Sequence, residues 1–217
     1  MDIFLFGHTG FIGKNIYNYL SSYKEYNLIG VSSETIDLTD VNSPLLLQKI
    51  LTPGSIIIMC VGVKKQLGDD INIFGKNIII INNFIKVISK IPVKKIIYFS
   101  SASVYGEDVA YTEKINEETP VQLRSYYGIA KYTAESLLKK NCFETKTQLI
   151  ILRPPLIYGK DDISRGYGPT GFVYKAINNE KIILWGDGKE LREFIYIEDI
   201  VKIVGALLKI KFQGTLN

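Results

Sequence analysis

The chain has 217 residues and an apolar content of 47%, enough for one globular domain with a hydrophobic core. Its 26 basic and 22 acidic residues give a net charge of +4 and are spread along the sequence, so the clustered basic surface that nucleic-acid backbones require is not expected. Because no apolar run approaches the length of a membrane span and the start lacks a basic leader, we expect a cytoplasmic protein without membrane contact.

Apolar segments of four to six residues alternate with longer amphipathic stretches along the first 152 residues. The apolar segments are typical of buried strands, and apolar residues three or four apart are typical of one helix face. In chain order, the pattern predicts strand 3–6, a helix through Ile12, Ile16 and Leu20, strand 27–31, helix 40–50, strand 56–61, helix 72–90, strand 95–99, helix 125–140 and strand 148–152.

Strands that alternate with helices and are apolar throughout predict a parallel sheet covered on both faces. With right-handed crossovers this is an α/β, doubly wound (Rossmann) sheet, whose ligands bind at the carboxyl ends of the strands. We assign residues 1–160 to this domain and residues 161–217 to a small, shortened substrate-binding lobe.

A glycine-rich turn joins the first predicted strand to the first helix. Glycines at this place let the chain turn tightly and let a pyrophosphate approach the main chain, where the helix N-terminus offers unpaired N–H groups. The spacing predicts dinucleotide binding by Gly7, Gly10, Phe11, Ile12 and Gly13. The only histidine, His8, lies in this turn and is read as a loop residue rather than a base.

The end of the second predicted strand bears on the choice between NAD and NADP. NAD-binding proteins usually have an acidic residue there for the ribose hydroxyls. Here Val31 is followed by Ser32 and Ser33, whose hydroxyls suit a 2′-phosphate, although no arginine accompanies them. The sequence therefore favours NADP and leaves NAD open. His8, Cys60 and Cys142 have no metal-ligand spacing, and no metal is expected.

Tyr127 and Lys131 lie four residues apart on a predicted helix and therefore share one helix face. A phenol with a pKa near ~10 is a poor base at neutral pH, and a nearby ammonium lowers that pKa. Tyr127 could then exchange a proton with a substrate hydroxyl, while a serine from the cluster at 100–103 holds the reacting oxygen. Without this context, a tyrosine packed beside a solvated lysine would explain the same spacing.

These motifs together resemble the extended short-chain dehydrogenase/reductase superfamily, specifically its NAD-dependent epimerase/dehydratase family, which acts on nucleotide sugars. The resemblance implies catalytic roles for Ser101, Tyr127 and Lys131. It also implies that Asp37 and Leu38 lie beside the adenine, that Cys60 and Val61 line the cofactor, that Asn72 supports the site and that Arg192 binds the substrate diphosphate. The matching stretches are 7–13, 37–40, 72–75, 100–106, 127–131, 152–159 and 186–199.

Departures from the family pattern narrow the implied reaction. Ala102 and Ser103 stand where similar 4,6-dehydratases have Asp-Glu, and Ser103 stands where GDP-fucose synthase has a cysteine. A nucleotide-sugar 4-epimerase or 4-keto reductase remains, with Ser103 as a substrate contact. Family members usually continue beyond the point reached at Asn217, so a non-catalytic NAD(P)-binding module or a truncated, inactive family member is the alternative. The resemblance also implies a homodimer formed through the helices at 72–90 and 125–140.

Overall fold

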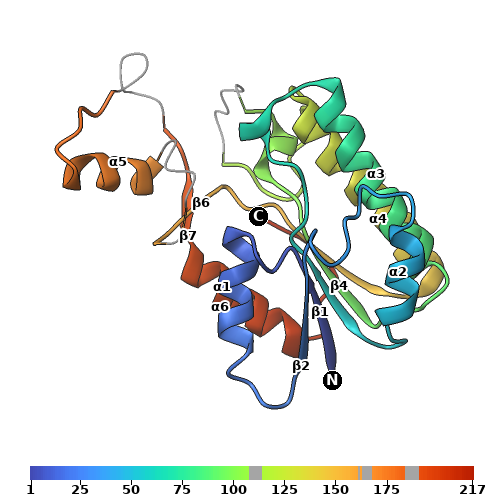
Figure 1. Cartoon of the computed structure of the whole chain (residues 1–217). Helices are drawn as coiled ribbons and strands as arrows, with labels where there is room; N and C mark the ends of the chain where they lie inside the picture. The colour runs from blue at the N-terminus through green and yellow to red at the C-terminus, as the bar shows by residue number, and fades with distance from the viewer. Residues whose placement is uncertain (108–113, 161, 163–167, 184–190) are drawn as a thin grey trace.

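The structure is a computed structural model that describes residues 1–107, 114–160, 162, 168–183 and 191–217. Its main sheet has six strands, all parallel, in the order β2-β1-β3-β4-β5-β8. Figure 1 shows this sheet with helices on both sides. This confirms the predicted doubly wound α/β fold, including all five predicted strands. The strands are β1 (Asp2–Phe6), β2 (Asn27–Val31), β3 (Ile56–Met59), β4 (Lys95–Phe99), β5 (Gln148–Leu152) and β8 (Gly214–Leu216).

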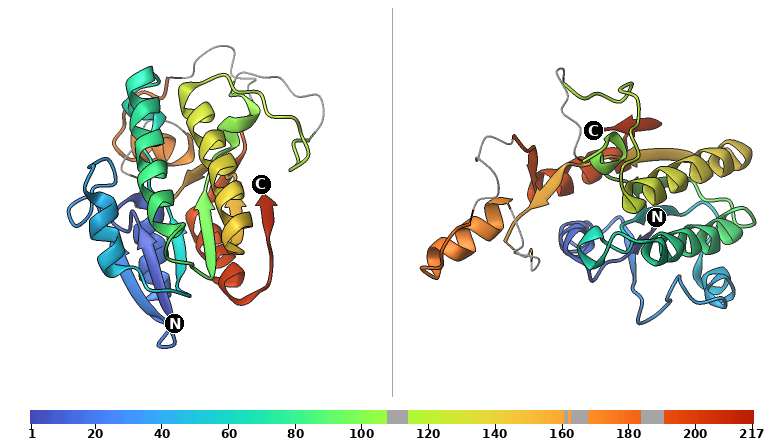
Figure 2. Two further views of the ribbon diagram at one scale, coloured as in Figure 1. Left: turned by 90° about the vertical axis from the view of Figure 1, so that its right-hand side faces the viewer. Right: turned by 90° about the horizontal axis from the view of Figure 1, so that it is seen from above.

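Helices cover both faces of the sheet, with α3 and α4 packed side by side on one of them (Figure 2). By length and composition α3 could cross a membrane, the one such helix among the described residues, and in this fold it covers the sheet. One face carries α2 (Ser43–Ile50), α3 (Ile71–Ile88) and α4 (Tyr126–Thr145), and the other carries α1 (Phe11–Leu20) and α6 (Ile197–Lys209).

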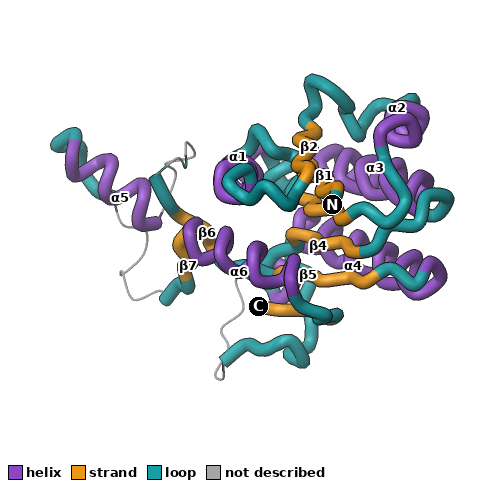
Figure 3. Tube along the Cα trace, turned by 90° about the horizontal axis from the view of Figure 1, so that it is seen from below, coloured by secondary structure: helices purple, strands orange, loops and turns teal. Residues whose placement is uncertain are grey.

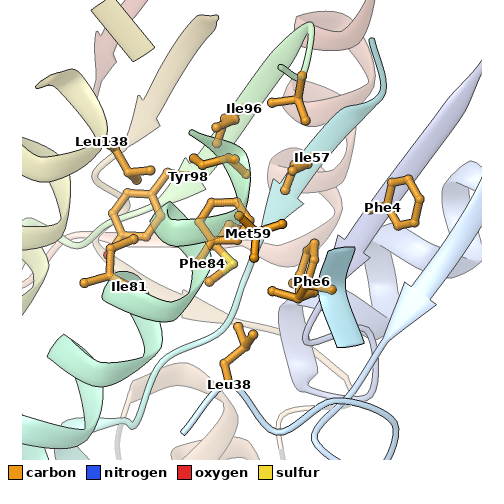
Figure 4. Packing of buried hydrophobic residues seen from close by; sticks show 14 of the residues in the cluster. Phe4, Phe6, Leu38, Ile57, Met59, Ile81, Phe84, Ile96, Tyr98 and Leu138 are labelled. Atoms are coloured by element: carbon orange, nitrogen blue, oxygen red, sulfur yellow. The ribbon is translucent and has the colours of Figure 1, made fainter. Parts of the chain in front are cut away.

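Alternate residues of each central strand supply the two halves of the core. Phe4 and Phe6 of β1 pack toward α3, where Phe6 and Phe84 meet edge to face with ring centroids 5.6 Å apart (Figure 4). Ile3 and Leu5 of the same strand face α1 and α6. Burying one such side chain contributes about 1.5–3 kcal/mol, so the continuously apolar strands account for a sheet covered on both faces.

In the last part of the chain, the structure differs from the predicted domain boundary at residue 160. After β5 the chain forms a small parallel sheet of β6 (Leu156–Tyr158) and β7 (Phe194–Tyr196), with α5 (Gly168–Ile177) beside it (Figure 3). It then returns, and α6 and β8 complete the main domain. Residues 197–217 were expected in the substrate-binding region but belong to the Rossmann sheet, because α6 buries an apolar face beside α1 and β8 pairs with β5.

The switch in strand order lies between β1 and β3. The connection through α1 leads from β1 to β2 on one side, and the connection through α2 leads from β2 back to β3 on the other. Such a switch opens a crevice at the carboxyl ends of the two central strands. Gly7 follows β1 and Cys60 follows β3, so the predicted dinucleotide-binding turn lies at this crevice.

Candidate cofactor and active site

The glycine turn is built on a contact between its first and last glycines. Gly7 has φ +79°, a conformation that favours glycine, and its N–H donates to the Val31 carbonyl at 2.8 Å. A Cβ atom on Gly13 would lie 2.1 Å from the Gly7 carbonyl oxygen. Only a glycine therefore allows α1 to start this close to the end of β1.

The first turn of α1 leaves main-chain donors available. The N-cap residue is Gly10, which has no side chain to accept hydrogen bonds from the N–H groups that follow. The turn begins with Phe11 and Ile12, both partly exposed, and continues with the buried Gly13. Unpaired N–H groups and the positive end of the helix dipole bind phosphate groups, so this end of α1 suits a pyrophosphate.

His8 is held by packing. Its imidazole lies against Gly30 of β2, where a Cβ atom would be 2.6 Å from the ring, and its ring centroid is 5.5 Å from that of Tyr17. Its Nδ1 atom is buried and has no hydrogen-bond partner within the described part of the chain. This position agrees with the reading of His8 as a loop residue.

A cavity beside the glycine turn brings four of the predicted cofactor residues together. Its lining includes Ser32 after β2, Asp37 and Leu38 from the next loop, and Val61 after β3. The Asp37 carboxylate accepts hydrogen bonds from the main-chain N–H and the hydroxyl of Thr39 at 2.9 and 2.8 Å, which fix its turn. Apolar walls with one carboxylate and the two serine residues Ser32 and Ser33 suit an adenosine group.

Asn83 is a residue of this region that the sequence analysis did not identify. It is buried on α3, and its Nδ2 donates to the carbonyl oxygens of Leu38 and Asp40, each at 3.0 Å. These two bonds hold the 38–40 loop against α3 beside the cavity. A polar residue within an otherwise apolar helix face was the available signal, because a buried amide requires partners.

Cys60 and Val61 lie directly against the glycine turn. A Cβ atom on Gly7 would be 3.3 Å from the Cys60 carbonyl carbon and from a Val61 methyl group. Burial raises the pKa of the Cys60 thiol, so the thiol stays protonated at neutral pH. Cys60 therefore acts here as a small apolar wall.

The serine cluster lies at the start of a short helical turn, η2 (Ala102–Tyr105), after β4. Ser101 is its N-cap, and the Ser101 Oγ accepts from the Ser103 N–H at 3.1 Å and donates to the Ser103 Oγ at 3.0 Å. Gly128 of α4 packs on this turn, since a Cβ there would lie 2.7 Å from the Ser103 carbonyl oxygen. That close approach brings the start of α4 to both serines.

Two polar side chains fix the N-terminus of α4, where Tyr127 lies. The Ser125 hydroxyl caps the helix by accepting from the Gly128 N–H at 3.0 Å. The Tyr127 N–H donates to the Asp69 carboxylate at 2.9 Å, a bond between α4 and the loop before α3. The neighbouring Asp70 caps α3 in the same way, so two consecutive acidic residues hold the starts of the two packed helices.

Lys131 lies one turn beyond Tyr127 and is 7% exposed. Its Nζ donates to the Phe99 carbonyl at 2.8 Å and is 5.7 Å from the Tyr127 ring centroid and 5.1 Å from that of Tyr98. Burial lowers its pKa to about 8, and the nearby Glu135 opposes that shift. The Lys131 ammonium therefore lies beside the Tyr127 ring, next to the carboxyl end of β4.

Asn72 and Arg192 are both exposed. Asn72 is exposed at the start of α3, and Asn77, one turn further along, reaches the loop after β3 instead, with its Oδ1 accepting from the Val63 N–H at 2.8 Å. Arg192 is exposed and donates to the Glu107 carbonyl at 3.2 Å, while Lys65 forms an ion pair with the Glu107 carboxylate. Of the matching stretch 186–199, residues 186–190 lie outside the described residues.

A doubly wound parallel sheet with a glycine turn at its switch point defines the chain as a dinucleotide-binding type of α/β protein. Residues 3–215 match the NAD dependent epimerase/dehydratase family, and the chain belongs to that family. The predicted family is therefore confirmed.

Individual relatives share modest sequence identity with the chain. It is 30% identical over 136 residues to a putative UDP-glucose 4-epimerase of Methanocaldococcus jannaschii, covering 61% of this chain and 42% of that protein. It is 27% identical to the GDP-6-deoxy-D-talose 4-dehydrogenase of Aggregatibacter actinomycetemcomitans, covering 100% and 74%. Among solved structures, the UDP-glucose 4-epimerase of Thermotoga maritima has a TM-score of 0.82 at 22% identity, covering 96% and 74%.

Proposed function

We propose that this chain binds NAD(P) and acts as a nucleotide-sugar 4-epimerase or 4-keto reductase through Ser101, Tyr127 and Lys131. The observation that carries the proposal is the buried Lys131 ammonium beside the Tyr127 ring, on a helix that packs against the Ser101 turn. Family membership supports the class of reaction, and the activities named for its relatives support a nucleotide sugar as substrate.

The proposed roles follow from charge and hydrogen bonding. The Lys131 cation favours the phenolate form of Tyr127, which then takes a proton from the sugar hydroxyl or returns it in the reverse direction. Ser101 holds the reacting oxygen with its hydroxyl. A bound nicotinamide supplies hydride acceptance and return at the sugar carbon.

The residues of the crevice fit a dinucleotide. Gly7, Gly10 and the first turn of α1 would hold the pyrophosphate, and the cavity containing Ser32 and Asp37 would hold the adenosine. The epimerase of Thermus thermophilus, with a TM-score of 0.81, was solved in complex with NAD. That neighbour favours NAD, whereas the serines after β2 favour NADP, and the proposal covers both.

On the substrate side, we assign Ser103 to a sugar contact and Arg192 to the diphosphate. Ser103 is hydrogen-bonded to Ser101 and lies beside the start of α4, so it borders the proposed reaction centre. A guanidinium binds a diphosphate through paired N–H donors. Asn72 is assigned a supporting role at the start of α3.

Two further proposals concern the whole protein. Family resemblance favours a homodimer through α3 and α4, the helices that lie beside the proposed site. We also propose a cytoplasmic enzyme that makes precursors of surface polysaccharides, since nucleotide sugars are the substrates named for its relatives.

Tyr127→Phe tests the catalytic role, because it removes the phenol oxygen and keeps the ring. We expect NAD(P)H binding, followed by the fluorescence of the reduced cofactor, to stay within about twofold, and turnover of a UDP- or GDP-sugar to fall at least about 100-fold. Tyr126→Phe on the neighbouring, exposed residue is the matched control. Unchanged turnover in Tyr127→Phe would exclude Tyr127 from the mechanism and favour the non-catalytic module.

The small molecules released when the purified protein is denatured distinguish the two reactions. Retained NAD is expected of an epimerase, which reuses its cofactor within each cycle. A site that is isolated empty and then binds NADPH is expected of a reductase. Absence of any NAD(P) binding, in a protein shown by circular dichroism to be folded, would reject the proposed function.

A further inference from the structure

A buried polar cluster lies directly behind the proposed catalytic residues. Its centre is Glu135 of α4, which is fully buried, and Arg153 directly after β5, which is 4% exposed. The Arg153 Nε and Nη2 donate to the two Glu135 carboxylate oxygens at 2.9 and 2.6 Å. The Ser100 hydroxyl, directly after β4, donates to the Glu135 Oε1 at 2.5 Å.

The cluster continues to the end of the chain. The Arg153 Nη1 donates to the Tyr105 hydroxyl at 2.7 Å, and this hydroxyl donates to the Asn217 Oδ1 at 2.9 Å. It therefore joins the carboxyl ends of β4, β5 and β8 to the turn that carries Ser101. These contacts lie at the carboxyl ends of the strands, where the proposed reaction centre is.

Glu135 is linked to two residues of the proposed catalytic set, Ser101 and Lys131. Ser100 directly precedes Ser101, so a bond to Ser100 restrains the main chain that positions the Ser101 hydroxyl. Lys131 is one helical turn before Glu135 on the same face of α4. One carboxylate is thus connected to both sides of the site.

The titratable groups around Lys131 show why the charge of Glu135 matters to this lysine. The titratable groups that face it are Tyr127 and Glu135 on α4, Tyr98 on β4 and Cys60 after β3. Of these, Glu135 is the carboxylate, and its charge favours the ammonium form that burial disfavours. A buried ion pair stabilises a fold little compared with apolar residues of the same volume. A contribution to stability therefore explains the Glu135–Arg153 pair poorly.

We propose that Glu135 is a positioning residue of the active site, which holds Ser101 in place through Ser100 and keeps Lys131 charged; this inference rests on the proposed function. Arg153 orients the Glu135 carboxylate through hydrogen bonds to both of its oxygens, and Tyr105 ties the pair to the Ser101 turn. Glu135 does not touch the substrate in this arrangement and acts through its neighbours.

Glu135→Gln tests the inference, because it keeps the side-chain volume and removes the charge. The first measurement is the titration of the Lys131 Nζ in the cofactor-free protein, by NMR of ¹⁵N-labelled lysines, with the signal assigned by its loss in Lys131→Arg. We expect the midpoint to fall, since the supporting carboxylate charge is lost. The matched control is Glu144→Gln on the same helix, where an exposed ion pair with Lys140 is removed and the midpoint should not change.

The second measurement is turnover as a function of pH. We expect Glu135→Gln to lower kcat about tenfold, with KM within about threefold, which marks the loss of an interaction used in the transition state. The alkaline limb of the pH profile should move to lower pH together with the Lys131 titration. A purely structural role would lower activity and thermal stability without moving that limb.

A buried Arg153 without its partner can prevent folding, and Glu135→Gln/Arg153→Gln then replaces the single variant because it removes both charges of the pair. A fall in the Lys131 midpoint in either variant supports the inference, and a midpoint equal to that of the unaltered protein overturns it. Since this titration needs neither cofactor nor substrate, it is independent of the Tyr127→Phe test. Full turnover in Tyr127→Phe would reject the proposed function. The effect of Glu135→Gln on the Lys131 midpoint would still be measured separately by NMR.

Discussion

At the scale of single residues, the contact between Gly13 and Gly7 controls the proposed cofactor site. Gly13→Ala would place a methyl group 2.1 Å from the Gly7 carbonyl oxygen and push α1 away from β1. We expect the free energy of unfolding to fall by about 1–3 kcal/mol, as in overpacked cores, and NAD(P)H binding to be lost. Denaturant unfolding and a fluorescence titration with NAD(P)H measure the two effects.

Gly75→Ala is the matched control for this change. Gly75 lies within α3, and a Cβ atom there would meet nothing within 4 Å. Alanine in a helix interior is favoured over glycine, so we expect unchanged binding and a gain of about 0.5–1 kcal/mol. Equal losses in both variants would show that crowding at Gly7 is not the cause.

Lys131 gives the stability of the protein a defined dependence on pH. Its folded-state pKa is lowered to about 8 by burial, below its ordinary value of 10.5. At pH 7 the lysine is charged in both the folded and the unfolded chain, so the cost of burying the ammonium is fully present. As the pH rises through 8, the folded protein loses the proton before the unfolded chain does, and the cost is relieved.

Lys131→Met, which removes this titration, provides the comparison. Between pH 8 and 10 we expect the free energy of unfolding of the unaltered protein to rise relative to that of Lys131→Met, by up to about 1.4 kcal/mol per pH unit. Urea unfolding of both proteins at several pH values measures the difference. A difference that is constant over this range would contradict the assignment of a lowered pKa to Lys131.

At the scale of elements, a buried lysine connects α6 to the sheet. The Lys95 Nζ at the start of β4 donates to the carbonyl oxygens of Leu207 and Ile210 at 2.5 and 2.9 Å. These carbonyls belong to the last turn of α6 and the residue that follows it, where a cation also complements the helix dipole. A single side chain thus terminates α6 and holds it against β4.

Lys95→Met keeps the length of the side chain and removes the donor. We expect the free energy of unfolding to fall by about 1–3 kcal/mol, because buried carbonyl groups lose their partner. Lys94→Met, at the exposed neighbouring position, should change it by less than about 0.5 kcal/mol. Equal effects of the two substitutions in thermal unfolding would contradict the capping role.

At the scale of the whole molecule, the outward face of α3 exposes apolar side chains beside α4, including Ile79, which is 44% exposed. If these helices form the proposed dimer interface, Ile79→Asp places a charge within it. We expect the variant to elute as a monomer where the unaltered protein elutes as a dimer, measured by size exclusion with light scattering.

Leu45→Asp on α2 is the control for this test, since Leu45 is also exposed, at 61%, and lies on a different helix. It should leave the assembly unchanged. Monomers for the unaltered protein would reject the dimer proposal, and dimers that persist in Ile79→Asp would remove α3 from the interface.

The elements that were predicted well are those whose formation depends on residues close together in the sequence. The five strands are continuous apolar segments, and the glycine turn has the spacing that its geometry needs. The helix predicted at 125–140 runs on to Thr145 and ends where Lys146 adopts φ +56°, a conformation that its sequence does not mark as glycine would. The helix predicted at 40–50 begins later, at Ser43, because the Asp40 carboxylate accepts from the Asn42 N–H and forms a turn first.

By itself the sequence determined the parallel sheet, the glycine turn and the tyrosine–lysine spacing, because each depends on residues close together in the chain. Only the tertiary structure decided that α6 and β8 rejoin the main sheet and that Glu135, Arg153 and Asn83 lie behind the proposed site. The physical reason is that a buried polar group finds its partner across the fold, at a separation in sequence that no local pattern records.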